Sequence, residues 1–446
     1  MQKLLTLLLP LSLGSALAAP DYAAVVGAHQ NARHFMGDVV IREKGKVIFQ
    51  QSAGLANVEF EVPNSAETVF EIGSVSKSFT AVAILKLQEQ GKLKVTDPLS
   101  KFLAGFAYGD QVTLHHLLTH TSGVPSFTSF PGFIETQKQN ISQEKIVEMF
   151  REKPLEFAPG DHFSYSNSGY TLLGRVIEKA SGMPYQQYIT EHVLAPLGFK
   201  KIAFHSRLDL VKNRASGYVL DGASFRLPEA HNVEIAGPAG GLFATASELS
   251  QWLPSLFEGK LLTPESIKAF SAPHVKIGNE PGFSSYGYGV GTGDMFGHQA
   301  VSHGGNINGF NAVTVYFPEE KISMTVTSNV EGISSTELVM DLIKTRFDVP
   351  VKLPTPRTLV SVPETVLKGY EGSYKAVEAP LSLRFYVHAG MMMLEIPGQG
   401  IFQLLPEAED RFYLSALDSE LTFKKTPEGM TLEVLAGGQI LHASRE

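Results

Sequence analysis

The residues at positions 74 and 77 have side chains that can do chemistry together. In the segment EIGSVSKSFTAV, residues 71–82, Ser74 precedes Lys77 by three positions. On a helix this spacing puts both side chains on one face, with the lysine amine within reach of the serine hydroxyl. A serine hydroxyl is a poor nucleophile unless a neighbour accepts its proton, and a lysine accepts a proton only when it is neutral. The pair is therefore a candidate for nucleophilic catalysis.

The spacing alone is weak evidence, because the chain contains a second serine–lysine pair three residues apart, Ser142 and Lys145. We expect Ser142 to cap the start of a helix and Lys145 to lie on its solvated face. Ser74 differs in its context. It follows Gly73, a residue that lets the backbone approach closely, and it begins a segment that is apolar on most sides through residues 81–87.

A second segment, HFSYSNSGY at 162–170, contains the one Tyr-x-Asn of the sequence, formed by Tyr165 and Asn167. The Tyr165 hydroxyl is suited to pass a proton to a leaving group. The Asn167 amide is suited to hold the Lys77 amine and a substrate carbonyl. A loop with an Asx turn that leads into the next helix is the alternative interpretation of this segment.

A third segment, VSHGGNINGFNAVTVYF at 301–317, precedes a hairpin. Its motif is His303, followed by Gly304 and Gly305, and we expect the two glycines to leave room for a substrate beside an exposed strand edge. The backbone N–H of Asn306 is expected to pair with that of Ser74 as an oxyanion hole.

The three motifs in this order resemble the penicillin-recognising serine hydrolases, in particular the branch of class C β-lactamases, D-alanyl-D-alanine carboxypeptidases, D-aminopeptidases and related esterases. Stretches at 112–125, 237–253 and 309–329 resemble that branch too, and the similarity covers about residues 25–347. It implies a helical subdomain packed on an α/β sandwich, with the active site between them. It also implies that Ser74 is the acylated nucleophile, Lys77 its base partner, Tyr165 the general acid/base, Asn167 the positioning amide and His303 the start of the third motif.

One departure from the family pattern concerns the substrate. Many β-lactamases of this group have a lysine where His303 stands, and its fixed positive charge binds the substrate carboxylate. A histidine is mostly neutral at pH 7, so this anchor is weakened, as in the D-aminopeptidase and esterase members. We predict a serine hydrolase that acts through an acyl-enzyme on a D-amino-acid peptide or an ester. A β-lactamase and a non-catalytic muropeptide-binding protein are the alternative hypotheses, and the choice of Lys77 or Tyr165 as acylation base is open.

The elements that must position these residues form an α/β pattern. Residues 38–54 and 311–329 each read as a hairpin, residues 74–91 as a buried helix, and residues 335–347 as an amphipathic helix. Strands at both ends of the domain predict one antiparallel sheet built from both termini, flanked by helices. Prolines break both helices and ladders, so we read residues 348–366 as a Pro-rich linker between the hydrolase domain, 19–347, and a C-terminal region, 367–446. That region carries short alternating runs that predict a small antiparallel β-barrel.

Composition and charge exclude several classes of protein. The 446 residues carry a formal net charge of −8 without a long run of one sign, which argues against nucleic acid as the main partner. Residues 1–18 read as a signal peptide, which predicts a periplasmic or secreted protein without an integral membrane segment in its mature form. No cofactor is expected, and the cluster of His115, His116 and His120 lacks the further ligands of a metal site. The expected partner is a small-molecule or peptide substrate, and the sequence leaves the oligomeric state open.

Overall fold

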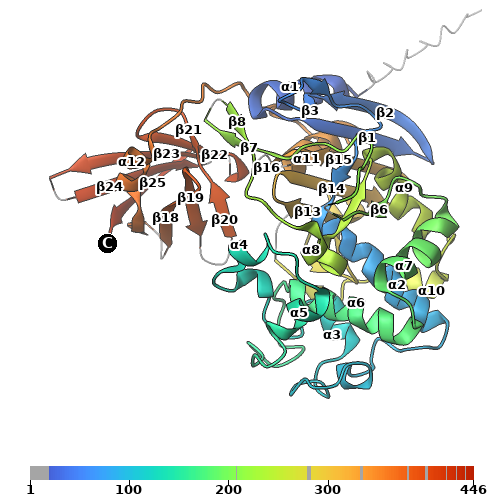
Figure 1. Ribbon diagram of the computed structural model, residues 1–446. Helices are drawn as coiled ribbons and strands as arrows, with labels where there is room; N and C mark the ends of the chain where they lie inside the picture. The colour runs from blue at the N-terminus through green and yellow to red at the C-terminus, as the bar shows by residue number, and fades with distance from the viewer. Residues whose placement is uncertain are drawn as a thin grey trace, which may run out of the picture.

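The computed structural model of the protein describes residues 20–206, 208–222, 224–278, 283–331, 335–378, 381–396, 400–417, 419–427, 429–436 and 438–446 (Figure 1). The predicted signal peptide, residues 1–18, lies outside these residues. Within the described part, no helix combines the length and apolar character that a membrane span requires.

The larger domain is built on one antiparallel sheet of eight strands. Its order is β10-β11-β12-β13-β14-β15-β1-β2, so the N-terminal hairpin joins the sheet beside β15. The two predicted hairpins are confirmed. The strands are β10 (Val275–Lys276), β11 (Ser285–Tyr286), β12 (Gly291–Met295), β13 (His298–Ile307), β14 (Phe310–Phe317), β15 (Ile322–Ser328), β1 (Gly37–Glu43) and β2 (Lys46–Ala53).

Helices cover both faces of this sheet. On one face, α1 (Tyr22–Arg33) and α11 (Ser335–Arg346) form a core with alternate residues of the central strands, such as Ile41 of β1. On the other face, the next residue of β1, Arg42, contacts α9 (Ala246–Phe257), since its Nε donates to Ser250 Oγ at 2.7 Å. Every residue of β14 and β15 is buried, as expected for strands covered on both sides. The expected layered α/β sandwich is confirmed.

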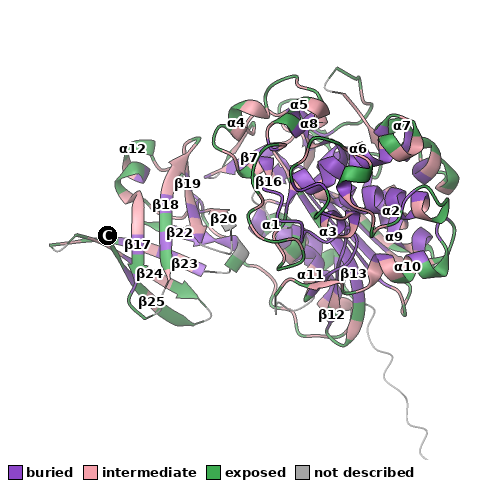
Figure 2. Cartoon of the chain, turned by 90° about the horizontal axis from the view of Figure 1, so that it is seen from below, coloured by how far each residue is buried: buried purple, intermediate pink, exposed green. Residues whose placement is uncertain are grey.

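A helical region packs beside the sheet and surrounds α2 (Ser76–Glu89), as Figures 1 and 2 show. Because α2 is apolar on most sides, it is buried among its neighbours, and it ends just before Gly91, as the sequence predicts. Trp252 of α9 joins α2 to the helix layer on the sheet. Its ring stacks on Phe79 at 3.8 Å between centroids, and its Nε1–H donates to Ser78 Oγ at 2.8 Å. The other helices here are α3 (Leu114–Leu118), α5 (Gln143–Glu148), α6 (Asn167–Ser181) and α8 (Val233–Gly240).

Short elements complete the domain. Of the two serine–lysine pairs, the second behaves as predicted, because Ser142 caps α5 and accepts a hydrogen bond from the Lys145 N–H. The short strands are β3 (Leu55–Asn57), β4 (Val62–Pro63), β5 (Phe70–Glu71), β6 (Ala203–Phe204), β7 (Tyr218–Asp221), β8 (Ser224–Arg226), β9 (Leu242–Ala244) and β16 (Val330–Glu331). The short helices are α4 (Phe133–Thr136), α7 (Tyr185–Ile189) and α10 (Pro264–Ser271).

The C-terminal region forms the predicted small antiparallel barrel-like sheet, shown in orange and red in Figure 1. Its interior is filled by alternate strand residues, among them Tyr374, Phe385, Phe412 and Phe423. It begins after the short helix α12 (Glu364–Leu367). The strand order is β20-β19-β18-β17-β25-β24-β23-β22-β21, with β17 (Gly372–Ala376), β18 (Ser382–His388), β19 (Met391–Ile396), β20 (Gly400–Gln403), β21 (Leu405–Pro406), β22 (Arg411–Leu414), β23 (Ser419–Thr426), β24 (Gly429–Ala436) and β25 (Gln439–Arg445).

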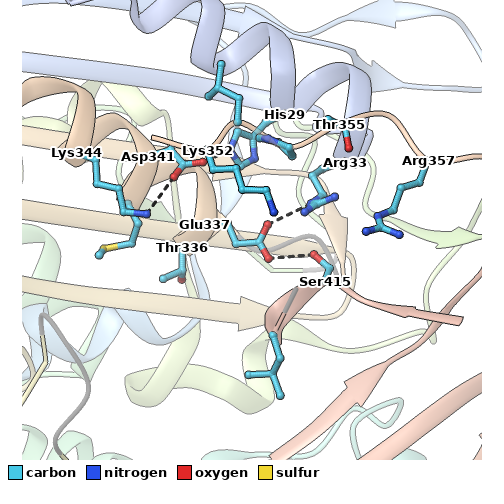
Figure 3. A pocket seen from close by; sticks show the side chains of 14 residues that line it. His29, Arg33, Thr336, Glu337, Asp341, Lys344, Lys352, Thr355, Arg357 and Ser415 are labelled. Atoms are coloured by element: carbon cyan, nitrogen blue, oxygen red, sulfur yellow. Dashed lines mark hydrogen bonds and ion pairs between the residues drawn. The ribbon is translucent and has the colours of Figure 1, made fainter. Parts of the chain in front are cut away.

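Polar and aromatic contacts join the barrel to the hydrolase domain at the end of α1. Arg33 of α1 donates to the Tyr413 hydroxyl at 2.6 Å, and the guanidinium of Arg357 lies 3.7 Å from the centre of the same ring. A cavity of about 560 Å³ lies at this seam, between α1, α11, the segment 352–357 and the turn at Ser415 (Figure 3). Glu337 bridges it, since its carboxylate contacts both Arg33 and Ser415. The Pro-rich segment is thus packed against both domains.

Candidate active site

Ser74 lies in a tight turn at the head of the buried helix. The turn is a single 3-10 turn, Gly73–Val75, which follows β5 and leads directly into α2. Gly73 has a φ of +48°, a left-handed conformation that favours glycine, and a Cβ there would also crowd the Asn306 nitrogen at 3.0 Å. The first N–H groups of a helix have no partner within it, which leaves the Ser74 amide free to bind a substrate oxygen.

Lys77 is fully buried and lies against the serine. Its Nζ is 2.9 Å from Ser74 Oγ and 2.7 Å from the carbonyl oxygen of Ala239, which α8 supplies. Within the described part of the chain, every hydrogen-bond partner of this amine is uncharged, and its other neighbours are the rings of Tyr165 and Tyr170. Burial without a carboxylate partner holds the pKa of Lys77 well below its ordinary value. We expected the Asn167 amide to hold this amine, but the Ala239 carbonyl takes that place.

The Tyr-x-Asn motif lies at the start of α6, where Ser166 is the N-cap residue. Tyr165 is 38% exposed, but burial of its hydroxyl end raises the pKa of Tyr165 above its ordinary value, and interaction with Ser74 only partly offsets this rise. The Asn167 Nδ2 donates to Thr128 Oγ1 at 3.1 Å, and its backbone N–H donates to Ser126 Oγ. These contacts hold Asn167 against the loop at 126–128.

The third motif runs along β13 and passes close to the serine turn. A Cβ on Gly305 would lie 2.0 Å from the carbonyl oxygen of Ile72 and 2.9 Å from the Ser74 nitrogen, and a Cβ on Gly73 would lie 3.0 Å from the Asn306 nitrogen. The two backbones therefore touch, and the amides of Ser74 and Asn306 come together. Gly304 faces the other way and is exposed. Both glycines were expected to leave space for a substrate. The lack of a side chain at Gly305 instead allows β13 to pack against the turn that holds Ser74.

His303 is buried and neutral. Its Nδ1–H donates to the Gly304 carbonyl oxygen at 2.5 Å, and its Nε2 accepts from the Tyr286 hydroxyl at 2.9 Å. In the neutral ring, the contact with the Gly304 carbonyl oxygen places the proton on Nδ1, so Nε2 is the acceptor. Burial, together with the Lys77 amine close by, lowers the pKa of His303 to about 3. It therefore offers a substrate carboxylate no positive charge near neutral pH.

A pocket of about 250 Å³ opens beside the serine. Three of the predicted residues, Ser74, Asn167 and Asn306, line it together, and none of the described residues around it is a lysine or an arginine. The remaining wall is mixed polar and apolar, formed by Gly73, Phe127, Thr128, Phe133, Gln137, His231, Asn232, Ile235, Ala236, Ala239, Gly240, Ile307 and Asn308. The pocket is thus suited to an uncharged acyl group with a small apolar part.

Sequence reasoning missed three groups of the site. The Ala239 carbonyl and the Tyr286 hydroxyl are ordinary in sequence and matter only through the segments they contact. His120 was assigned to a histidine cluster, but its ring lies 4.2 Å from that of Tyr165. His115 instead contacts Tyr288, and the described residues hold no group of three or more His, Cys, Asp and Glu side chains suited to a metal ion.

A serine in contact with a buried lysine, beside a close approach of the Ser74 and Asn306 backbones on an α/β sandwich, is the arrangement expected of a serine hydrolase. Residues 23–341 match the family described as Beta-lactamase, and the chain belongs to that family. It is a family of serine hydrolases, and the site residues Ser74, Lys77, Tyr165 and His303 all fall inside the matched range.

Relatives and solved structures agree with this assignment. The chain is similar to "Penicillin-binding protein 4*" of Bacillus subtilis (strain 168), with 29% identity over 413 residues, 87% of this chain and 90% of the relative. Its structure resembles the octameric penicillin-binding protein homologue from Pyrococcus abyssi, with a TM-score of 0.67, 27% identity, and coverage of 95% of this chain and 98% of that one. It also resembles a D-stereospecific amidohydrolase from Streptomyces sp., with a TM-score of 0.64, 25% identity, and coverage of 74% and 99%.

Proposed function

We propose that the protein forms an acyl-enzyme on Ser74 and that Lys77 is the base that accepts the serine proton. One observation carries the proposal, the 2.9 Å contact between Lys77 Nζ and Ser74 Oγ. The amine in this contact is fully buried among uncharged partners, so its neutral form is favoured. A neutral amine beside a serine hydroxyl is what nucleophilic attack requires.

We infer that Lys77 and not Tyr165 is the acylation base, because burial shifts the pKa values of the two groups in opposite directions. Burial lowers the pKa of Lys77 and raises that of Tyr165, so at neutral pH the amine is the group able to accept a proton and the phenol is the group able to donate one. A neutral amine that donates one N–H to the Ala239 carbonyl oxygen can turn its lone pair to Ser74 Oγ and accept the serine proton across the 2.9 Å contact. Pairs of groups whose pKa values are pushed apart mark acid and base roles.

The reaction proceeds in two halves. Ser74 Oγ attacks the substrate carbonyl as its proton passes to Lys77, and the amides of Ser74 and Asn306 bind the oxyanion. The bond to the leaving nitrogen or oxygen then breaks while the Tyr165 hydroxyl gives that atom a proton, and Lys77 returns a proton to the tyrosine. Water next attacks the acyl carbon while Lys77 accepts its proton, and Lys77 then gives that proton to Ser74 Oγ as the acyl–oxygen bond breaks, which releases the acid and restores the hydroxyl.

The substrates we propose are D-amino-acid amides, peptides and esters. The pocket beside Ser74 combines aromatic and amide side chains with no lysine or arginine among its described lining residues, which suits an uncharged substrate. The similarity to a D-stereospecific amidohydrolase supports the D configuration. A β-lactamase is the second candidate, favoured by the family to which the chain belongs.

A β-lactam and its methyl ester separate these two candidates. Because His303 is neutral and no lysine or arginine is among the described lining residues of the pocket, we expect benzylpenicillin and its methyl ester to acylate Ser74 at rates within about 3-fold of each other. Stopped-flow measurement of acylation would check this. A loss of about 100-fold on esterification would instead show that a cation anchors the carboxylate, as in an efficient β-lactamase.

The test of the proposed function is covalent labelling. After reaction with a fluorophosphonate, intact-protein mass spectrometry is expected to show one adduct, mapped by peptide analysis to residues 71–82 and missing in Ser74→Ala. D- and L-phenylalanine p-nitroanilide then report the stereochemical preference through release of nitroaniline. A wild-type protein that binds muropeptides but neither labels nor turns over would identify a non-catalytic binding protein.

We also propose that the protein is exported. Its first residues combine Lys3, the apolar run 4–13 and the small residues 16–18, a pattern typical of a secretory signal. A periplasmic or secreted location would place the enzyme beside peptidoglycan, which is the main source of D-amino-acid peptides. Fractionation of cells producing the full-length chain, with N-terminal sequencing of the exported product, would test the export and the predicted cleavage after Ala18.

A further inference from the structure

His120 is buried at the centre of a cluster of aromatic rings that includes the ring of Tyr165. It is 1% exposed, and rings of Tyr165, Tyr170, Tyr286 and Phe163 surround it at centroid distances between 4.2 and 5.7 Å. We propose that His120 is the positioning residue for Tyr165: as a neutral imidazole protonated on Nε2, it fixes the tyrosine hydroxyl between Ser74 and the leaving group. This inference rests on the proposed function, because it gives Tyr165 the role of proton donor.

His120 binds the backbone on both sides of Tyr165. Its carbonyl oxygen accepts from the Ser164 N–H at 2.8 Å, and its Nδ1 accepts from the Ser166 N–H at 3.0 Å. Its ring also stacks on the Tyr165 ring, with 4.2 Å between centroids and 29° between planes. One residue therefore restrains the tyrosine through the amide before it, the amide after it and the ring itself. Tyr165 is 38% exposed, so solvent-side packing restrains it less.

The hydrogen bond to Nδ1 also determines the protonation state of His120. A nitrogen that accepts a backbone N–H carries no proton, so the proton of the neutral ring is on Nε2, and the doubly protonated ring would lose this contact. Burial and the nearby Lys77 and His303 act in the same direction, since they hold the pKa of His120 well below its ordinary value. His120 and His303 are thus neutral in opposite tautomers.

Two features show that this arrangement is maintained against a cost. His120 has a φ of +57°, a left-handed conformation that is uncommon for a residue with a side chain. Its Nε2–H is buried and has no hydrogen-bond partner among the described residues. Strained backbone and unpaired buried donors are retained mainly where function requires them. Here the strain aims the imidazole at Tyr165, and the lack of a carboxylate partner keeps the ring uncharged beside Lys77.

Three variants separate the contacts. His120→Ala removes both the ring and the acceptor, whereas His120→Asn keeps a side-chain acceptor near Nδ1 and tolerates a positive φ. His34→Asn is the matched control, because His34 also has a positive φ, 54°, at the end of α1 and outside the site. We expect kcat to fall about 100-fold in His120→Ala and about 10-fold in His120→Asn, with KM unchanged and His34→Asn within 2-fold of wild type.

A double-mutant cycle tests whether His120 acts through the tyrosine. In a Tyr165→Phe background, where the hydroxyl is already absent, we expect His120→Ala to lower kcat by less than about 3-fold further. A full additional loss of 100-fold would overturn the proposal, and so would an equal loss in His120→Ala and His120→Asn, which would indicate a purely structural role.

Two measurements do not depend on turnover, so failure of the proposed function is distinguishable from failure of this inference. Long-range 15N NMR of histidine-labelled wild type, assigned through the signal lost in His120→Asn, is expected to show a neutral Nε2–H tautomer from pH 5 to pH 9. A crystal structure of His120→Ala is expected to show the Tyr165 hydroxyl displaced by about 1 Å or more. An Nδ1–H tautomer, or an undisplaced hydroxyl, would refute the positioning role even in a protein without activity.

Discussion

Replacing Lys77 with methionine is expected to abolish turnover while making the protein more stable. Methionine keeps the length and apolar stem of lysine but cannot accept the Ser74 proton, and loss of a general base costs about 10³–10⁴-fold in kcat. The wild-type amine is fully buried without a carboxylate partner, which costs folding free energy that methionine does not incur. We expect the free energy of unfolding to rise by about 1–2 kcal/mol at pH 7.

The stability difference should depend on pH in a direction set by the lysine. Because folding lowers the pKa of Lys77, the unfolded chain binds a proton that the folded chain does not, between the folded pKa and the ordinary value of 10.5. The stability of the wild type therefore falls as pH decreases through this window. The advantage of Lys77→Met should be smallest near pH 10.5 and larger at pH 7, as thermal unfolding at both values would show.

The second serine–lysine pair supplies the control for this prediction. Lys145 has the same spacing from Ser142 but is exposed to solvent and paired with Glu148 at 2.8 Å. Lys145→Met should leave kcat within about 2-fold of wild type and the free energy of unfolding within about 0.5 kcal/mol. If the stability difference between Lys77→Met and wild type did not change between pH 7 and pH 10.5, the pKa of Lys77 would not be lowered by folding, and its role as a base would be contradicted.

A single methyl group at position 305 is expected to disable the site by a different route. A Cβ on Gly305 would lie 2.0 Å from the Ile72 carbonyl oxygen and 2.9 Å from the Ser74 nitrogen, both of them backbone atoms that cannot rotate away. Gly305→Ala should push β13 from the serine turn and separate the two oxyanion amides. Loss of one such donor costs about 10²–10³-fold in kcat, which the rate of p-nitrophenyl ester hydrolysis would measure.

Gly304, the neighbour of Gly305, provides a matched control for this substitution. A Cβ on Gly304 would meet only the Ala312 carbonyl oxygen, at 3.8 Å, an ordinary contact. Gly304→Ala should therefore keep kcat within about 5-fold of wild type. Circular dichroism and thermal unfolding would establish that both variants fold. Equal losses in the two variants would show that the glycines serve the substrate, as the sequence analysis expected, and not the approach of the strand to the turn.

Several elements were predictable because they depend on residues close in sequence. The hairpin around residues 43–46 and the end of α2 near Gly91 follow from local turn chemistry and from apolar periodicity, and the structure has both. The helix cap at Ser142 and the exposed position of Lys145 were predicted from a capping pattern that is equally local. The order of the three motifs indicated the family, which the match over residues 23–341 establishes.

Contacts between distant segments were not predictable in this way. The Ala239 carbonyl that binds Lys77 comes from a segment 162 residues away, and nothing in its local sequence marks it. Asn167 has the right type and position, but serine and threonine residues of another loop take its backbone and side-chain hydrogen bonds. His120 was visible in sequence only as one of three histidines, because stacking depends on where its ring lies.

The sequence by itself determined which groups are available for chemistry: a serine and a lysine one helical turn apart, a tyrosine, and a histidine where related β-lactamases carry a lysine. The tertiary structure decided their charge. Lys77 can be neutral because α2 is enclosed by α6, α8 and α9, and His303 is neutral because its two nitrogens meet Tyr286 and Gly304. Residue type sets only an ordinary pKa, whereas burial and hydrogen-bond partners, which come from the whole fold, set the protonation state at which the site operates.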